Sequence, residues 1–206
     1  VKLPMIEVQD HRRFLKTHLP VDALVFSPEV KYIYVARDGR DVLWSMFNHH
    51  VHLNNILYDG LKALPVQFGP IIEPPRTQNI REYFLDWLKE DGFPFWAFWE
   101  NIRTWWKIRH LPNVHFVHFQ NLKNDMEGEM EIIGAYLGYD VGAITKGRWD
   151  DYVRQCTFTH MKNNAPNSTP MGGALWDGGA QVFVNTGTNK RWADTLTAED
   201  IEQYEK

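Results

Sequence analysis

Two side chains near the start of the sequence, Lys16 and His18, have the chemistry of an acid–base pair. An imidazole titrates near neutral pH, so His18 suits a general base, and the ammonium of Lys16 can stabilise a developing negative charge. The run 12–17 (RRFLKT) predicts a short strand that Pro20 helps to end. Residues two apart on a strand share a face, so we expect Lys16 and His18 to lie together. A solvated strand end without a chemical role is the alternative.

An anion site is predicted directly after the run 31–36 (KYIYVA), whose β-branched and aromatic residues are typical of a buried strand. The residues that follow carry apolar side chains at the spacing of one helical face. A strand that turns sharply into a helix aims backbone N–H groups and the positive helix end beyond the strand, where Arg37 adds a charge and Ser45 a hydroxyl. The alternative is that Arg37 pairs with Asp38 or Asp41 and that Ser45 only packs.

A purine site is predicted at the start of the segment 157–187, whose many Gly, Pro, Asn, Ser and Thr residues indicate a long loop. Hydroxyl, aromatic and thioether groups gather here and could hold a purine ring by stacking. They come from Cys156, Thr157, Phe158 and Met161.

A second anion-binding turn is predicted at residues 186–192 (TGTNKRW). Gly187 allows close approach of the backbone, and two cations, Lys190 and Arg191, stand beside it. Basic turns are common on surfaces, so this motif carries weight only together with the others.

Three histidines in four positions, His49, His50 and His52, raise the question of zinc. Adjacent histidines on a helix diverge by ~100°, and no carboxylate or cysteine stands at ligand spacing. We therefore expect these histidines to pack at a helix end, and we predict no metal site.

The remaining pattern predicts an α/β fold. A third strand is expected at 114–119 (VHFVHF), ended by Gln120 and Asn121, and residues 53–77 form a proline-rich loop that could cover a site. Helices that alternate with strands imply parallel pairing, which collects ligand-binding groups at the carboxyl ends of the strands. We therefore expect all three strand ends to converge. Helices are predicted at 79–89, 94–109, 126–137 and 148–156 and after the cap Thr197.

Composition limits the class of protein. The chain has 206 residues, 44% of them hydrophobic, which supports one sizeable core, so we expect one domain over residues 1–206. A net charge of −4 argues against a general nucleic-acid binder. One cysteine excludes an internal disulfide framework, and no apolar run approaches the ~20 residues that span a bilayer. We expect a soluble, intracellular protein.

Several motifs together resemble the cytosolic-type sulfotransferases. They are Lys-Thr-His-Leu-Pro at 16–20, Tyr-Val-Ala-Arg-Asp at 34–38 with Ser45, and Gly187 with Trp192, in this order. Those enzymes move a sulfuryl group from 3′-phosphoadenosine 5′-phosphosulfate (PAPS) to a hydroxyl or amine. The resemblance implies a P-loop nucleotide-kinase-like α/β fold with a central parallel sheet flanked by helices. It also implies PAPS as co-substrate without a metal, a small-molecule hydroxyl acceptor and a cytoplasmic protein, and it leaves a homodimer open.

The resemblance also implies roles for individual residues. His18 would be the catalytic base and Lys16 a catalytic cation near the bridging phosphosulfate oxygen. Arg37 and Ser45 would hold the 3′-phosphate. The adenine pocket would be lined by Phe119, Phe158 and Met161 with Cys156 and Thr157 alongside, and the turn Asn185, Thr186 and Gly187 would close over the 3′-phosphate.

The sequence departs from the family in two places. The usual phosphosulfate loop, Pro-Lys-Ser-Gly-Thr-Thr-Trp, and the first strand before it are absent, and the chain begins and ends inside patterned segments, so we expect a truncated domain. The alternative is a remnant that has lost the 5′ side of its donor site. Before Gly187 the family usually has Lys or Arg-Lys, whereas Asn185 and Thr186 stand here, and Lys190 and Arg191 could substitute.

Two other function classes stay open. A phosphoryl-transferring kinase-like enzyme would share the basic strand ends, but it would need a Gly-x-x-x-x-Gly-Lys-Ser/Thr loop, which this sequence lacks. A nucleotide-binding or interaction domain without catalysis is the other. The identity of the acceptor cannot be read from the residues.

Overall fold

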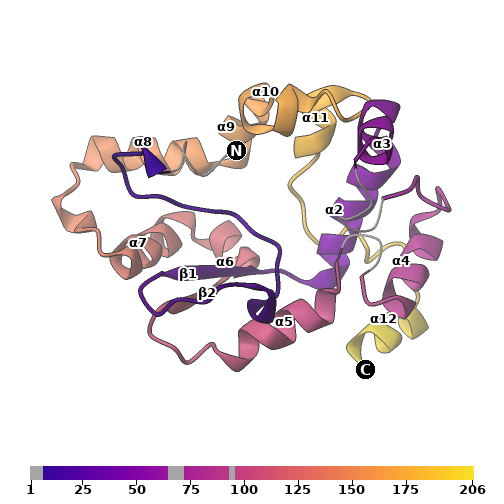
Figure 1. Cartoon of the computed structure of the whole chain (residues 1–206), viewed down its shortest axis with the longest axis horizontal. Coiled ribbons are helices and arrows are strands. Elements are labelled where there is room, and N and C mark those ends of the chain that lie inside the picture. The colour runs from indigo at the N-terminus through magenta and orange to yellow at the C-terminus, as the bar shows by residue number, and fades with distance from the viewer. Residues whose placement is uncertain (1–6, 65–71, 93–95) are drawn as a thin grey trace.

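A computed structural model of the chain describes residues 7–64, 72–92 and 96–206. Its sheet consists of two parallel strands, β1 (Tyr32–Ala36) and β2 (Val114–His118), which appear at the lower centre of Figure 1. Tyr32 lies opposite Val114 and Ala36 opposite His118, so the carboxyl ends of both strands meet at the same edge. The α/β class and the parallel pairing of these two strands are therefore confirmed.

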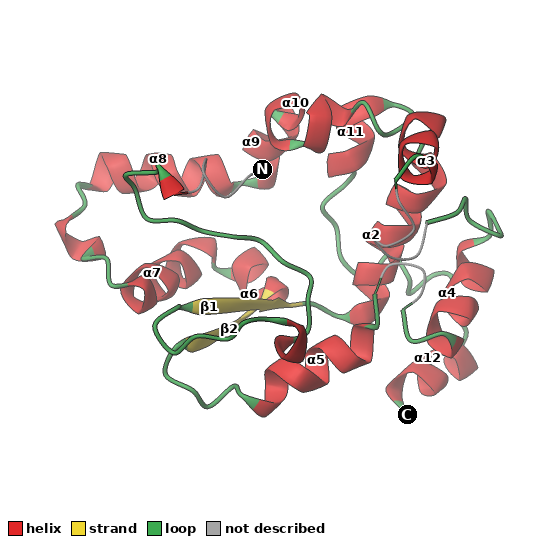
Figure 2. Cartoon of the chain, in the orientation of Figure 1, coloured by secondary structure: helices red, strands yellow, loops and turns green. Residues whose placement is uncertain are grey.

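Helices make up most of the remaining structure described (Figure 2). Between the strands lie α2 (Gly39–His52), α3 (Asn55–Lys62), α4 (Ile80–Lys89) and α5 (Phe98–Lys107). After β2 come α6 (Phe119–Asn124), α7 (Met126–Leu137), α8 (Lys146–Cys156), α9 (Phe158–Asn163), α10 (Ala165–Ser168), α11 (Gly179–Val184) and α12 (Ala198–Glu205). Short 3₁₀ turns span Val21–Ala23, Val141–Ala143 and Pro170–Gly173.

The predicted helices agree with α2, α4, α7, α8 and α12. The helix predicted over 94–109 begins at Phe98, and residues 93–95 lie outside the described part. Thr197 caps α12 through a capping box in which its hydroxyl and the Asp200 carboxylate each accept a backbone N–H of the other residue.

The strand predicted at residues 12–17 is wrong. The segment has no ladder partner among the described residues, and Phe14 is 88% exposed. Its contacts are with the end of α7 instead, where the Arg12 guanidinium donates to the Leu137 carbonyl over 2.7 Å and lies over the Tyr139 ring. A strand needs a neighbour for its N–H and C=O groups, and β propensity alone cannot supply one.

The loops predicted at 157–187 and 53–77 are also partly wrong. The first contains α9, α10 and α11, and the second contains α3, whereas residues 65–71 of the second lie outside the described part. The short helices of the first are joined by contacts between segments: the Lys162 ammonium donates to the carbonyls of Gln181 and Asn185. Helices this short have little intrinsic stability, so their sequences carry little helical signal.

The hydrophobic core lies between α2, α4, α5 and α12. Its buried members are Leu43, Trp44, Tyr83, Phe84, Trp87, Phe98 and Leu196. The aromatic face of α5 is thus largely core. Farther along α5, Trp105 packs against the rings of Tyr32 and Tyr34, which covers one face of β1. None of the helices described is long and apolar enough to cross a bilayer.

Candidate functional site

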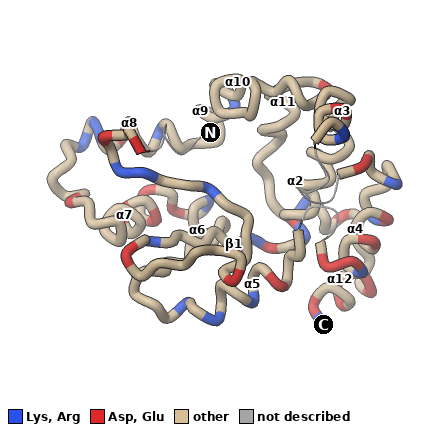
Figure 3. Tube along the Cα trace, viewed as in Figure 1, with Lys and Arg blue, Asp and Glu red and all other residues tan. Residues whose placement is uncertain are grey.

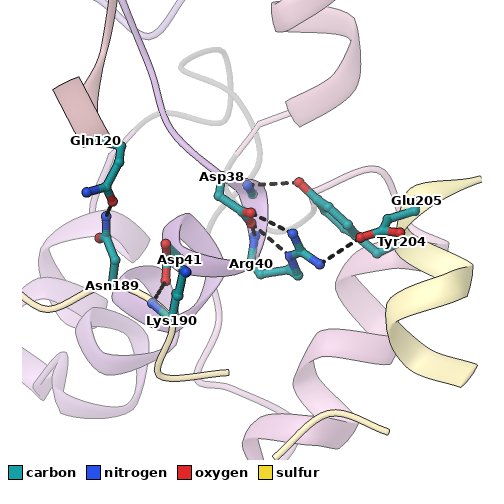
Figure 4. Close-up of polar contacts among 9 residues, drawn as sticks. Asp38, Arg40, Asp41, Gln120, Asn189, Lys190, Tyr204 and Glu205 are labelled. Carbon is teal, nitrogen blue, oxygen red and sulfur yellow. Dashed lines mark hydrogen bonds and ion pairs between the residues drawn. The ribbon is translucent and has the colours of Figure 1, made fainter. Parts of the chain in front are cut away.

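Arg37 lies at the carboxyl end of β1, directly before the cap of α2. Asp38 is the N-cap: its carboxylate accepts the Arg40 N–H over 2.9 Å and forms an ion pair with the Arg40 guanidinium at 2.7 Å. The Gly39 N–H donates to the Tyr204 hydroxyl over 2.9 Å (Figure 4). The prediction that free N–H groups face the anion is therefore wrong for these two amides, and the positive charge at this end comes from side chains.

The Arg37 guanidinium is held by contacts from two distant segments. Its Nη2 donates to Asn189 Oδ1 over 2.7 Å, and its Cζ lies 4.5 Å from the centre of the Phe119 ring. Its Nε is buried and has no hydrogen-bond partner among the described residues. The alternative ion pairs with Asp38 or Asp41 are not formed. A buried guanidinium N–H that lacks an acceptor can donate a hydrogen bond to a bound oxyanion.

The C-terminal turn at residues 186–192 is fastened to both strand ends. Asn189 donates to Gln120 Oε1 over 2.9 Å, and the Lys190 N–H donates to the buried Asp41 carboxylate over 2.6 Å (Figure 4). Arg37, Phe119, Gln120 and Asn189 therefore form one group, which we call the strand-end cluster. Two of the three predicted strand ends, those of β1 and β2, converge here together with the turn, whereas the third, at residues 16–18, does not belong to a strand.

Burial shapes the electrostatics of this cluster. It lowers the pKa of Arg37, an effect that the nearby Arg191 charge reinforces and that the carboxylates of Asp41 and Asp38 oppose. Burial also lowers the pKa of Arg191, again opposed by Asp41. Both guanidinium charges are thus held where water screens them poorly, which strengthens their attraction for an anion.

Gly187 lies against an aromatic ring from α9. Its φ is +65°, and a Cβ added there would stand 2.4 Å from Cδ2 of Phe158. The Lys123 ammonium from α6 donates to the Gly187 carbonyl over 2.6 Å. The structure thus brings Phe158 and Gly187 together and ties the turn to α6, which also carries Phe119.

Other predicted nucleotide residues have local contacts only. The Thr157 hydroxyl caps α9 and donates to the Arg154 carbonyl, and the Thr186 hydroxyl is 3.1 Å from that of Thr188. The Asn185 carbonyl accepts from Lys162. Cys156 and Met161 are exposed, and the half-buried Ser45 makes no hydrogen bond within the described part of the chain.

His18 is fixed to β1 through an asparagine of α5. Asn101 donates to the His18 carbonyl over 2.9 Å and accepts the Tyr34 hydroxyl over 3.0 Å. The His18 ring stacks on Trp96 with 4.5 Å between ring centres and 14° between planes. These contacts hold His18 near β1, although its own segment is not a strand.

The charge around His18 is positive. Desolvation lowers the pKa of His18, and the charge of Lys16 lowers it further. Figure 3 shows basic residues along the amino-terminal segment that runs above β1. A neutral imidazole beside a cation fits the roles predicted for the pair, since a base must be unprotonated to accept a proton.

The histidines of α2 pack at the helix end as predicted. His50 is buried between the Tyr83 hydroxyl and the Glu73 carbonyl, at 2.9 and 2.7 Å, and His52 Nδ1 lies 2.7 Å from the Asn48 carbonyl. His49 contacts the rings of Trp176 and Phe183. The described residues hold no group of three side chains that could bind a metal ion.

The sulfotransferase domain model matches residues 1–206. The chain belongs to this family. Among curated relatives, the glycolipid sulfotransferase Rv1373 of Mycobacterium tuberculosis (strain ATCC 25618 / H37Rv) is 29% identical over 98% of this chain and 67% of its own length. Sulfotransferase 1A1 of Rattus norvegicus is 27% identical over 98% of this chain and 64% of its own length. The chain thus spans about two thirds of the length of these relatives.

Solved structures show the same fold. Mouse sulfotransferase SULT7A1, crystallised with PAP, superposes with a TM-score of 0.73 at 21% identity, covering 99% of this chain and 66% of that one. Retinol dehydratase, in complex with androsterone and the inactive cofactor PAP, gives a TM-score of 0.71 at 24% identity over 98% of this chain and 54% of that one. The sulfotransferase fold expected from the motifs is therefore confirmed.

Several contacts of this sulfotransferase domain were not predicted from sequence. Asn189, Asn101 and Asp41 were absent from the predicted site, although each holds a part of it. Asn189 stands inside the predicted anion-binding turn and Gln120 at a predicted strand end, so their positions in the sequence could have indicated a role in the site. Asn101 lies within a helix, and no feature of the sequence indicates its role.

Proposed function

We propose that this sulfotransferase domain binds PAPS and transfers its sulfuryl group in line to a hydroxyl, or an amine, of a small acceptor, with His18 as the base. The observation that carries the proposal is the strand-end cluster. A half-buried guanidinium, whose Nε has no partner among the residues described, lies where both strand ends meet the C-terminal turn. Such a site binds an oxyanion, and a nucleotide carrying a 3′-phosphate supplies one.

The residues present fit the 3′-phosphate and the adenine of such a nucleotide, whereas the loop that holds the 5′ side in the family is absent from this sequence. Arg37 would hold the 3′-phosphate, with Ser45 as a second donor if its side chain rotates toward it. Phe119 and Phe158 offer aromatic surface for the adenine, since they contact Arg37 and Gly187 respectively. Cys156, Thr157, Met161, Asn185 and Thr186 stay proposed neighbours of the nucleotide on the strength of the family resemblance alone.

The chemistry assigns separate tasks to His18 and Lys16. When bound, PAPS supplies a sulfuryl group whose transfer leaves adenosine 3′,5′-bisphosphate. An imidazole nitrogen of His18 would take the proton that the acceptor oxygen loses as its bond to sulfur forms. The ammonium of Lys16 would stabilise the charge that gathers on the oxygen whose bond to sulfur breaks.

The molecules bound in similar structures support this class of reaction. Two similar structures contain PAP, and one of them also contains androsterone, a small acceptor-sized molecule. We propose a small hydroxyl compound as the acceptor of this chain as well. A cytoplasmic location and a possible homodimer remain expectations from the resemblance, and a single domain remains an expectation from chain length and composition.

Replacing His18 tests the proposal. The wild-type chain, given PAPS with a labelled sulfuryl group and a panel of simple phenols and alcohols, should transfer the label to at least one acceptor. His18→Ala should abolish transfer while leaving the affinity for adenosine 3′,5′-bisphosphate nearly unchanged. His11→Ala, which removes an exposed histidine of the same segment, should keep both.

Three other outcomes would count against the proposal. If the wild-type chain binds the nucleotide but transfers nothing, the binding domain without catalysis is favoured. If His18→Ala loses nucleotide binding and transfer together, His18 has a structural role. If His18→Ala keeps full transfer activity, it is not the base.

A further inference from the structure

We propose that Arg191 is the second cation of the anion site beside Arg37, and that Lys190, its neighbour in the turn, does not contact the anion. This inference rests on the proposed function, because it assigns a further residue to the 3′-phosphate of the same nucleotide. It also explains how the domain grips that phosphate although Asn185 and Thr186 place no charge before Gly187.

The backbone of Arg191 is fixed on both sides to the first turn of α2. On one side, the Lys190 N–H donates to the Asp41 carboxylate over 2.6 Å. On the other side, the ring of Trp192 lies 3.9 Å from the Arg40 guanidinium carbon. Arg191 is therefore held at the start of α2, the same place to which Arg37 leads from β1.

The Arg191 side chain is half-buried. It makes no hydrogen bond or ion pair within the described part of the chain, whereas the guanidinium of Arg40 has partners in Asp38 and Glu205. The charge of Arg191 acts on Arg37, and the carboxylate of Asp41 acts on both.

Two guanidinium groups beside the Asp41 carboxylate leave an excess of positive charge in a half-buried place, because the other nearby carboxylate, Asp38, is already paired with Arg40. Like charges repel strongly where water is scarce, so this arrangement is unfavourable until an anion joins it. Because a phosphate monoester carries about −1.5 to −2 charges at pH 7 and several acceptor oxygens, it satisfies both arginines. The 3′-phosphate is the monoester of the proposed nucleotide.

Lys190 does not share this geometry. Lys190 is exposed and has a φ of +63°, and it contacts Asp41 through its backbone N–H and not through its side chain. A substitution at Lys190 therefore removes one positive charge from the same turn while keeping that contact. It is the matched control for Arg191.

Calorimetric titration of three proteins tests the inference. For Arg191→Gln, we expect the affinity for adenosine 3′,5′-bisphosphate to fall roughly 10- to 150-fold, the loss of a charge-assisted phosphate contact. The affinity for adenosine 5′-monophosphate, which lacks the 3′-phosphate, should change less than about twofold. Lys190→Gln should change both affinities by less than about twofold, because exposed charges are well screened.

The possible failures are distinguishable. Equal losses in Arg191→Gln and Lys190→Gln, or no loss in Arg191→Gln, would overturn the inference and leave the proposed function standing. A wild-type chain that binds neither nucleotide would overturn both. If Arg191→Gln does not fold, Arg191→Lys decides: a loss of about three- to tenfold, from the missing bidentate geometry, supports the inference, and wild-type affinity overturns it.

Discussion

The guanidinium of Arg37 shows how one side chain can join distant parts of a chain. It donates to Asn189, lies over Phe119 and keeps one buried N–H unsatisfied among the residues described. The amide of Asn189 is a neutral acceptor, so a phosphate oxygen can replace it and gain the stronger charge-assisted bond. In our proposal, the Asn189 contact keeps Arg37 in place until the nucleotide binds.

Replacing Arg37 with alanine should weaken nucleotide binding. We expect the affinity for adenosine 3′,5′-bisphosphate to fall about 10- to 150-fold, which corresponds to ~1.5–3 kcal/mol for a charge-assisted phosphate contact. Calorimetry measures this directly, and Arg109→Ala, which removes an exposed arginine at the end of α5, is the control. An unchanged affinity in Arg37→Ala would rule out a phosphate contact by this side chain.

At the scale of elements, the contact between the C-terminal turn and α9 depends on a glycine. Gly187 has a left-handed backbone and has the Phe158 ring where a Cβ would be. A second glycine, Gly179, has a similar φ of +69°, but nothing lies within 4 Å of its Cβ position. Comparing the two glycines therefore separates the cost of a positive φ from the cost of the contact between a Cβ and the Phe158 ring.

Alanine at these two glycines should have unequal effects. Gly179→Ala should lower the free energy of unfolding by about 1–2 kcal/mol, the cost of a left-handed conformation for a residue with a Cβ. Gly187→Ala should cost roughly a further 1–3 kcal/mol through overpacking against Phe158, and it should weaken nucleotide binding as well. Urea unfolding measures the first effect and calorimetry the second. Equal losses of stability would mean that Phe158 moves away freely.

The packing of α2 against α11 depends on a neutral histidine. Burial against Trp176 and Phe183, and the nearby His52, lower the pKa of His49 from 6.5 to about 4. Between these values the unfolded chain binds more protons than the folded one. The contribution of His49 to stability is therefore complete above pH 6.5 and is lost as the pH falls toward 4.

Stability should consequently fall in mild acid, and part of the fall should be traceable to His49. Between pH 7.5 and pH 5.0, the wild-type chain should lose about 2 kcal/mol of unfolding free energy through this residue. His49→Phe keeps an aromatic ring in the cluster and should show a fall smaller by about that amount. Some dependence should remain, because burial also lowers the pKa of His50. Identical pH profiles for the two proteins in urea unfolding would contradict this role.

Elements with strong local patterns were predictable, and those held by tertiary contacts were not. The apolar run that forms β1 and the periodic helices α2 and α7 follow their sequences closely. Residues 12–17 have the composition of a strand but no partner strand among the described residues, so the strand predicted from composition does not form. The short helices α9 and α11 depend on Lys162 reaching across to Gln181, a contact that a local pattern cannot contain.

The site residues also divide into those that local sequence indicates and those that only tertiary contacts reveal. The types of Arg37, His18 and Gly187, and the order of their motifs, led to the prediction of a nucleotide site at the strand ends, which stays a prediction. The side chains that hold these residues in place could not be predicted, because Asn101 and Asn189 form hydrogen bonds with residues 83 and 152 positions away in the sequence. The sequence indicates the types and the order of the site residues, but only the folded structure determines which of their side chains form hydrogen bonds with one another.

At the scale of the molecule, three regions far apart in the chain converge. The end of β1, the start of α6 and the C-terminal turn meet at the strand-end cluster, and α5 holds the segment of His18 against the same strand. A ligand that contacts several of these regions at once would stabilise them together. Its binding should therefore appear as a change in the stability of the whole fold.

The most direct test is thermal unfolding of the wild-type chain with increasing adenosine 3′,5′-bisphosphate, and with adenosine for comparison. At about 100 times the dissociation constant, a ligand that binds only the folded state adds about 2.7 kcal/mol of stability. For a chain of this size, this raises the melting temperature by roughly 5–10 °C. We predict such a rise with the bisphosphate and a much smaller one with adenosine. An unchanged melting temperature at millimolar bisphosphate would contradict the account.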